Sequence, residues 1–109
     1  MADASFYFNK GMEYYDAKHW PMAIEQFTLA IRVNPRLRSM SAYFYRGLAY
    51  YSLPGYDEEA IQDMDVLIQF YPNNATYYSV RSSLYTNIRE HGKAYRDKDK
   101  ACSLDNYYC

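Results

Sequence analysis

The most informative part of this 109-residue chain is the segment Tyr43-Phe44-Tyr45-Arg46-Gly47-Leu48-Ala49-Tyr50. An earlier copy reads Tyr7-Phe8-Asn9-Lys10-Gly11-Met12-Glu13-Tyr14, and a weaker later copy reads Tyr78-Ser79-Val80-Arg81-Ser82-Ser83-Leu84-Tyr85. The copies are spaced 36 and then 35 residues apart. Self-similarity at a nearly fixed period of this size is the sequence signature of a protein built from stacked structural repeats.

A second element repeats in phase with the first. Its most regular copy is Ala23, Phe27, Ala30 and Pro35, which is followed by Ala60, Met64, Leu67 and Pro72 and then by Ala94, Lys98 and Ala101. Each unit therefore reads as a first helix, a short turn and a second helix. Tyr7, Gly11 and Tyr14 share one face of the first helix, because they are spaced at i, i+4 and i+7.

The small residues in this pattern predict a close contact between the two helices of each unit. Gly11 and Gly47 lack a Cβ, which otherwise keeps a neighbouring helix away, and glycine inside a helix costs about 1 kcal/mol unless it has such a role. The matching small residues on the second helices are Ala23 and Ala60. Pro35 and Pro72 cannot continue a helix, so they are expected to close the first two units.

This pattern resembles the tetratricopeptide repeat, a helix–turn–helix unit of about 34 residues. The resemblance covers three repeats, at about 4–37, 40–73 and 75–106, in a single domain spanning 1–109. It implies an all-α fold, a short right-handed solenoid of six helices at about 4–16, 20–33, 40–52, 57–70, 75–89 and 93–105. The third repeat departs from the pattern, because Ser82 replaces the glycine, Lys98 replaces the aromatic residue and no proline follows.

Composition narrows the class of protein. Half of the residues are hydrophobic, 15 are tyrosines and the net charge is −1, which indicates one folded domain and argues against a nucleic-acid partner. No apolar run approaches the roughly 20 residues that cross a membrane, and the first residues do not read as a signal peptide. Two cysteines, Cys102 and Cys109, are too few for a disulfide scaffold and fit a reducing compartment. We therefore expect a cytoplasmic protein.

The residues that could support catalysis are dispersed along the chain. His19 and His91 each lie beside a predicted turn, where a solvent-facing role is the simpler interpretation, and neither cysteine has a histidine at zinc-ligand spacing. The glycines are isolated, so there is no phosphate-binding loop. The basic segment 89–100 also contains acidic residues and reads as a solvated surface. We expect no enzyme activity, no cofactor and no metal site.

The family resemblance also implies structural and binding roles for particular positions. It predicts the ion pairs Arg46–Asp63 and Arg81–Asp97. Members of the family usually bind peptides in a concave groove lined by the first helices. The corresponding stripe begins at Ser5, Ser41 and Thr76 in the three repeats and continues through the candidate contact residues Phe8, Met12, Tyr15, Phe44, Leu48, Tyr51, Ser79, Ser83 and Asn87.

Two interpretations of this apolar stripe stay open. Such a stripe at helical spacing can be core, packed between neighbouring first helices. It can also be a surface for a ligand or for a second copy of the chain, because the tyrosine–glycine stripe already supplies a core face and a helix apolar nearly all round must be covered.

The best-known groove of the family clamps a terminal carboxylate of heat-shock chaperones with lysine, asparagine and arginine side chains. None of the five clamp residues is present, since those positions hold Phe8, Met12, Tyr45, Thr76 and Val80. We therefore expect a protein-interaction module, adaptor or chaperone-like, that binds an apolar peptide or helix. The alternative is a self-associating or structural subunit of a larger complex, with the aromatic groove or the C-terminal end as its interface.

Overall fold

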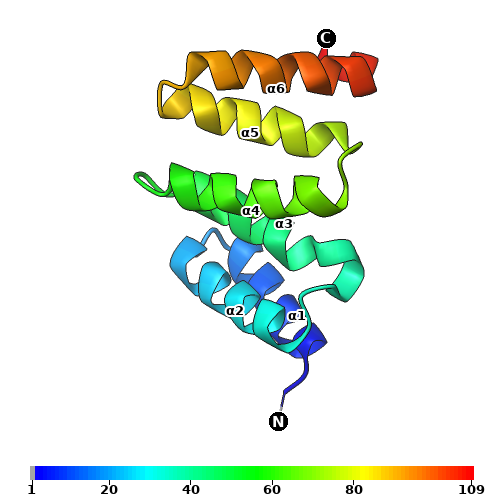
Figure 1. Cartoon of the computed structure of the whole chain (residues 1–109). Helices are drawn as coiled ribbons and strands as arrows, with labels where there is room; N and C mark the ends of the chain where they lie inside the picture. Colours follow the sequence, from blue (N-terminus) through cyan, green and yellow to red (C-terminus); the bar gives the residue numbers. More distant parts are fainter. Residues whose placement is uncertain (1) are drawn as a thin grey trace.

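The computed structural model describes residues 2–109, which fold entirely into helices and connecting turns. The helices are α1 (Ala4–Asp16), α2 (Trp20–Val33), α3 (Leu37–Tyr51), α4 (Asp57–Phe70), α5 (Ala75–Asn87) and α6 (His91–Leu104), followed by the short 3-10 helix η1 (Asn106–Tyr108). They form three hairpins stacked in chain order, with the two termini at opposite ends of a body measuring 44 × 27 × 20 Å (Figure 1). The predicted all-α architecture of stacked helix pairs is confirmed.

Helix boundaries agree with the sequence for α1, α2 and α4 and differ slightly for the others. The helix α3 begins at Leu37 rather than near residue 40, because Arg38, Ser39 and Met40 form a left-handed turn with φ of 50°, 56° and 67° ahead of the right-handed helix. The helix α5 ends at Asn87, two residues early, because Arg89 adopts φ of 64° and reverses the chain. The turn is therefore shifted two residues toward the N-terminus without a change in length, and α6 begins two residues earlier than predicted, at His91.

In the first two hairpins, a glycine of the first helix meets a large side chain of the second helix. A Cβ on Gly11 would lie 2.5 Å from a ring carbon of Phe27, and a Cβ on Gly47 would lie 2.6 Å from the terminal methyl of Met64. In the third hairpin Ser82 occupies the glycine position, and its hydroxyl donates a 2.8 Å hydrogen bond to the carbonyl of Ala94. The glycine positions therefore set how closely the paired helices approach.

The core runs through the stack along the second helices. Ala23, Phe27 and Ala30 of α2 and Ala60, Met64 and Leu67 of α4 are all fully buried. The first group packs against α1 and α3, and the second packs against α3 and α5. Pro35 and Pro72 follow the ends of α2 and α4 and are exposed, and the Pro72 carbonyl accepts a 2.7 Å hydrogen bond from the Tyr78 hydroxyl. Each hairpin thus completes its core only with its neighbour.

The turn inside each hairpin contains one residue in the left-handed region. Lys18, Gly55 and Arg89 occupy equivalent places, with φ of 61°, 88° and 64°. The following amides, those of His19 and Glu90, donate to carbonyls of the preceding helix at 2.9 Å, which satisfies groups that the helix end leaves unpaired. Only the second turn uses glycine, the residue that adopts this conformation without cost.

Two ion pairs connect the helices of the second and third hairpins, as predicted. Arg46 donates to both carboxylate oxygens of Asp63 at 2.9 and 2.6 Å, and Arg81 donates to those of Asp97 at 2.7 and 2.8 Å. Both carboxylates are buried. Although burial lowers the pKa of the Arg46 guanidinium, the hydrogen bonds and charge of Asp63 raise it more, so the group stays charged. Arg81 also bridges repeats two and three through a 2.9 Å bond to Asp65.

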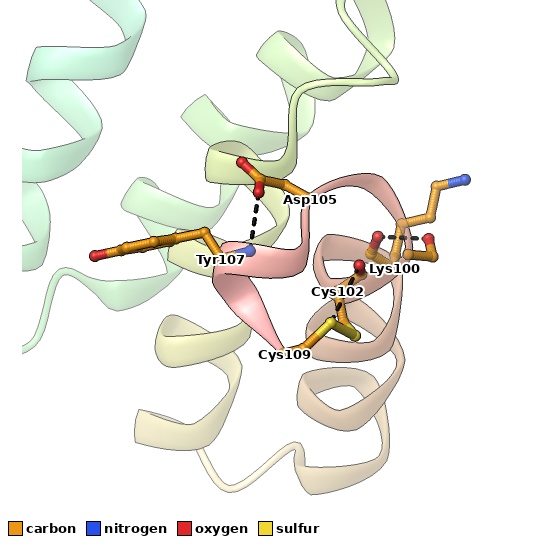
Figure 2. The surroundings of a disulfide bond; sticks show 6 residues. Lys100, Cys102, Asp105, Tyr107 and Cys109 are labelled. Atoms are coloured by element: carbon orange, nitrogen blue, oxygen red, sulfur yellow. Dashed lines mark hydrogen bonds between the residues drawn. A yellow bond between two sulfur atoms is a disulfide. The ribbon is translucent and has the colours of Figure 1, made fainter.

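The C-terminal end corrects our interpretation of the cysteines. Cys102 and Cys109 form a disulfide, so the pair no longer argues for a reducing compartment (Figure 2). In an uninterrupted helix, residues seven apart would lie about 10 Å apart, too far for this bond. The chain leaves α6 after Leu104 and turns back, which brings the two Cα atoms within 4.5 Å. The cytoplasmic location stays a prediction.

Replacing Gly11 with alanine tests the close contact between helices. The added Cβ meets the fully buried Phe27 ring, which has no free space, so we expect Gly11→Ala to reduce the free energy of unfolding by about 1–3 kcal/mol in a urea titration. Gly92 in α6 has nothing within 4 Å of its Cβ position, so Gly92→Ala is the control. It should stabilise the helix slightly, by up to about 1 kcal/mol. Equal effects of the two variants would contradict this account.

Removing Asp63 tests the buried ion pair. Asp63→Ala leaves the Arg46 guanidinium partly buried without its carboxylate, so we expect a loss of about 3 kcal/mol in the free energy of unfolding. Asp65→Ala is the matched control. It removes an aspartate whose side chain is 50% exposed and leaves Arg81 bound to Asp97, so the loss should stay below about 1 kcal/mol. A small loss for Asp63→Ala would show that the pair contributes little.

Candidate peptide-binding groove

The predicted groove stripe lies on α1, α3 and α5, but its members differ in exposure. Leu48 and Tyr51 of α3 lie outside the hydrophobic core clusters of the described residues, and Tyr51 is 38% exposed. Met12 and Tyr15 of α1 are partly buried and pack at the edge of the core of the first two hairpins. Among the apolar members of the stripe, Tyr51 is therefore the most exposed.

Phe8 corrects the predicted groove. Its side chain is only 5% exposed, and its ring packs 5.8 Å from Phe27 and 6.3 Å from Tyr45, measured between ring centroids. The guanidinium of Arg38 covers the ring from the left-handed turn, 5.0 Å from the centroid. For Phe8 the alternative interpretation of the stripe, burial between neighbouring first helices, is the right one. The side chain is not available to a ligand.

Phe44 has an intermediate position. It is partly buried, and its ring lies 5.4 Å from Tyr45 and 5.6 Å from Tyr77 of α5. It stands in α3 where Phe8 stands in α1, but α5 covers it less completely than α3 covers Phe8. Phe44 therefore contributes to the core between the second and third hairpins while part of its side chain reaches the surface.

Tyr45 is the residue that sequence reasoning missed. The centroid of its ring lies 5.3 Å from that of Tyr15, 6.3 Å from that of Phe27 and 5.4 Å from that of Phe44. Tyr45 therefore connects the first two hairpins. Tyr15 in turn packs edge-on against Trp20 at 5.3 Å. The available signal was the run of three aromatic residues at 43–45, which is longer than the repeat pattern requires. Offset and edge-on aromatic contacts of this kind add about 0.5–1.5 kcal/mol each beyond burial.

Two phenol groups, that of Tyr15 on the stripe and that of Tyr77 beside Phe44, stay protonated. Burial, followed by the proximity of Tyr45 and Asp16, raises the pKa of Tyr15. Burial and the nearby Tyr71 raise the pKa of Tyr77. The phenols are thus neutral groups at physiological pH and can donate or accept a hydrogen bond. The first two thirds of the stripe combine apolar rings with neutral hydroxyls and present no fixed charge for an ionic ligand.

The third-repeat part of the stripe is polar. Ser83 donates a long 3.4 Å bond to the carbonyl of Ser79, and the Asn87 amide donates at 3.4 Å to Asp57 at the start of α4. Ser79 and Ser83 also line a shallow cleft of about 240 Å³ whose other walls are Ser82, Lys98, Ala101 and Tyr108. The hydroxyl of Tyr108 lies 2.8 Å from that of Thr76. The chain's own C-terminal end therefore borders this part of the stripe.

The described residues 2–109 do not assemble a group of three metal-ligating side chains, and none of their helices is long and apolar enough to cross a membrane. The carboxylate-clamp positions hold Phe8, Met12, Tyr45, Thr76 and Val80, and four of these pack in or against the hydrophobic core. What the arrangement offers is a contact surface of apolar and neutral polar groups.

No family model matches the chain. A curated relative, the DnaJ homolog subfamily C member 7 homolog of Dictyostelium discoideum, is 32% identical over 98 residues, which is 88% of this chain. The chain spans only 18% of that relative's length.

Several solved structures share the fold. The Arabidopsis OM64 TPR domain superposes with a TM-score of 0.84 over 95% of this chain and 84% of its own, at 23% identity. The first TPR of Spaghetti (RPAP3), solved with an HSP90 peptide, has a TM-score of 0.84 over 95% of this chain and 80% of its own, at 19% identity. At these identities the likeness shows the fold.

Truncating Tyr45 tests its role at the junction of the hairpins. We expect Tyr45→Ala to lower the free energy of unfolding by about 3 kcal/mol, because four aromatic neighbours lose their shared partner. Tyr51 lies further along α3 and is 38% exposed. Tyr51→Ala should therefore lower the free energy of unfolding by less than about 1 kcal/mol. Thermal or urea unfolding of both variants checks this, and similar losses would argue against a special role for Tyr45.

Proposed function

We propose that this chain, a tetratricopeptide repeat domain of three repeats, is a non-catalytic protein-interaction module that binds an apolar peptide or helix along α1, α3 and α5. The observation on which the proposal rests is the apolar strip formed by Met12, Tyr15, Leu48 and Tyr51. The strip extends from α1 of the first repeat to α3 of the second, and each of its side chains keeps part of its surface in contact with solvent. Phe44 extends the strip toward α5.

The chemistry of the strip favours a ligand recognised by apolar side chains. Two leading contacts would be Leu48 and Tyr51, which the core does not enclose. Ser79, Ser83 and Asn87 would provide hydrogen-bonding groups at the third-repeat end. The RPAP3 domain binds an HSP90 peptide, whereas here the clamp positions lack basic side chains. We therefore propose an adaptor or chaperone-like role that does not depend on a terminal carboxylate.

A second candidate function is self-association or assembly into a larger complex through the C-terminal end. Tyr95 on α6 and Tyr107 on η1 are 73% and 84% exposed, more than the other large hydrophobic side chains of the described residues. Exposed aromatic rings at one end of a repeat stack suit a protein interface. This candidate predicts an interface at the end of the stack rather than along the groove strip.

A quantitative pull-down from the native source separates these functions. Leu48→Glu/Tyr51→Glu places two charges on the groove strip, and a groove ligand should lose about 30-fold or more in affinity if each side chain contributes about 1 kcal/mol or more. Met22→Glu/Val33→Glu is the matched control, because both residues lie on α2 and are 49% and 52% exposed. Unchanged helical circular dichroism and unfolding midpoints must accompany the comparison.

The outcomes divide clearly between the candidates. Partners lost with the groove variant and kept by the α2 variant support groove binding. Partners kept by both variants contradict it. If sedimentation velocity then shows an oligomer that Tyr95→Glu/Tyr107→Glu disperses, the C-terminal end is the interface, whereas a monomer at high micromolar concentration would exclude the homo-oligomeric form of that candidate.

A further inference from the structure

In each of the first two repeats, residues of both helices form a surface that faces the next hairpin. In repeat one this surface includes Phe8, Phe27 and Ala30, and Ala42 and Tyr45 of α3 cover it. In repeat two it includes Met64 and Leu67, with Leu84, Tyr77 and Val80 of α5 packed against it. In both repeats the next first helix therefore seals an apolar surface.

The equivalent surface of repeat three is covered differently. The matching positions are Ser79, Ser82, Lys98 and Ala101, and they line a cleft together with Tyr108 of the C-terminal turn, defined here as residues 106–109. Tyr108 of this turn packs against the buried cluster of Ala75, Tyr78 and Ala101. Its hydroxyl makes a hydrogen bond with Thr76, the first groove position of the third repeat. The C-terminal turn thus covers the part of this surface around Ala101, whereas Lys98 stays exposed.

The non-covalent attachment of the C-terminal turn is slight. Its amides are satisfied locally, because Tyr107 donates to the Asp105 carboxylate at 2.9 Å (Figure 2), and Cys109 donates to the Asn106 carbonyl at 3.1 Å. The Tyr107 ring is 84% exposed, so Tyr108 makes the main contact with α5. One ring and one hydroxyl hydrogen bond must offset the conformational entropy of the ordered turn. The disulfide to Cys102 adds the constraint that keeps the turn in place.

We propose that the Cys102–Cys109 disulfide controls access to the third-repeat end of the groove. When it is closed, Tyr108 stays against Thr76. When it is reduced, the C-terminal turn detaches and Thr76, Ser79 and the adjoining cleft become available to a bound peptide. This regulation rests on the proposed function, because the ligand that gains access is the peptide bound along α1, α3 and α5.

The chemistry requires a dithiol reductant, such as a thioredoxin-like protein or dithiothreitol. One thiolate of the reductant attacks a sulfur of the disulfide and forms a mixed disulfide, and its second thiol then releases the protein. Two electrons and two protons pass to Cys102 and Cys109, which become thiols, while the reductant becomes a disulfide. If the chain is cytoplasmic, as predicted, such a bond belongs to the transient, redox-sensing kind.

The first test needs no ligand. Hydrogen exchange measured by mass spectrometry on the whole chain, before and after dithiothreitol, should show about tenfold faster exchange in residues 104–109 once the bond is reduced. Because the chain has only two cysteines, Cys102→Ser must exchange like the reduced wild type and must not respond to dithiothreitol. Tyr108→Ala removes the contact with α5 while the disulfide stays closed. Residues 75–78 of this variant should therefore exchange as fast as those of the reduced wild type. In Tyr107→Ala the same residues should exchange at the rate of the oxidised wild type.

The same experiment can overturn the proposal. Equal exchange in residues 104–109 of the oxidised and reduced wild type would show that the disulfide does not hold the turn. Two free thiols in air-oxidised, denatured wild type would show that the bond does not form. Either result is independent of whether the groove binds peptide.

The second test asks whether opening the turn affects binding. The proteins captured in the pull-down are compared for oxidised wild type, reduced wild type and Cys102→Ser, with Leu48→Glu/Tyr51→Glu as the groove control. We expect several-fold more capture by the reduced chain and by Cys102→Ser, because occlusion lowers the binding-competent fraction. Equal capture by all three, with loss in the groove control, overturns the redox control and keeps the groove. Capture that the groove control leaves intact contradicts the proposed function instead.

Discussion

The contact between the two helices of a repeat, made where glycine leaves no Cβ, is the constraint on which the rest of the structure depends. At Gly11 the space of a methyl group is filled by the Phe27 ring, and at Gly47 it is filled by the end of Met64. These large side chains are fully buried and also form the surface on which the next hairpin packs. Because no hairpin buries its apolar face alone, the spacing set at one glycine is transmitted to the whole stack.

The aromatic stripe of the first helices serves two roles that compete for the same side chains. Phe8 and Tyr45 hold the first two hairpins together, while Tyr51 is exposed and Leu48 is half-buried outside the core clusters. Phe44 is partly buried, because Tyr77 of α5 packs against one part of its ring. A substitution in this stripe therefore affects stability or binding according to how far the next hairpin covers that residue. The groove in this protein is the part of the stripe that packing between repeats leaves uncovered.

The outer surface of the third repeat differs in composition from the equivalent surfaces of the first two repeats. Serine and lysine replace the apolar residues that the first two repeats bury, so this surface tolerates water. Ala101 is still buried, because Tyr108 lies over the cluster to which it belongs. A covalent bond across a turn of this size compensates for the small contact area that four residues provide. On the third repeat, polar side chains therefore allow contact with water, and the disulfide holds the turn that covers the remaining apolar cluster.

Much of this architecture follows from local pattern. The boundaries of α1, α2 and α4 came from helical periodicity and from proline and asparagine at helix ends, and the family resemblance predicted the pairing of Arg46 with Asp63. These features depend on residues within one repeat, where spacing along a helix determines which side chains share a face. The same spacing placed Phe8 and Tyr51 on one predicted stripe, and it could not distinguish the buried residue from the exposed one.

That distinction arises between repeats, from side chains far apart in the sequence. Phe8 is buried because Tyr45 and Arg38 reach it from the following hairpin, and the left-handed turn at 38–40 that positions Arg38 has no signal in composition. Cys102 and Cys109 pair only because the chain reverses after Leu104, since a continued helix would have kept them apart. Periodicity identifies the face that a residue occupies, whereas contacts across the stack determine what covers it.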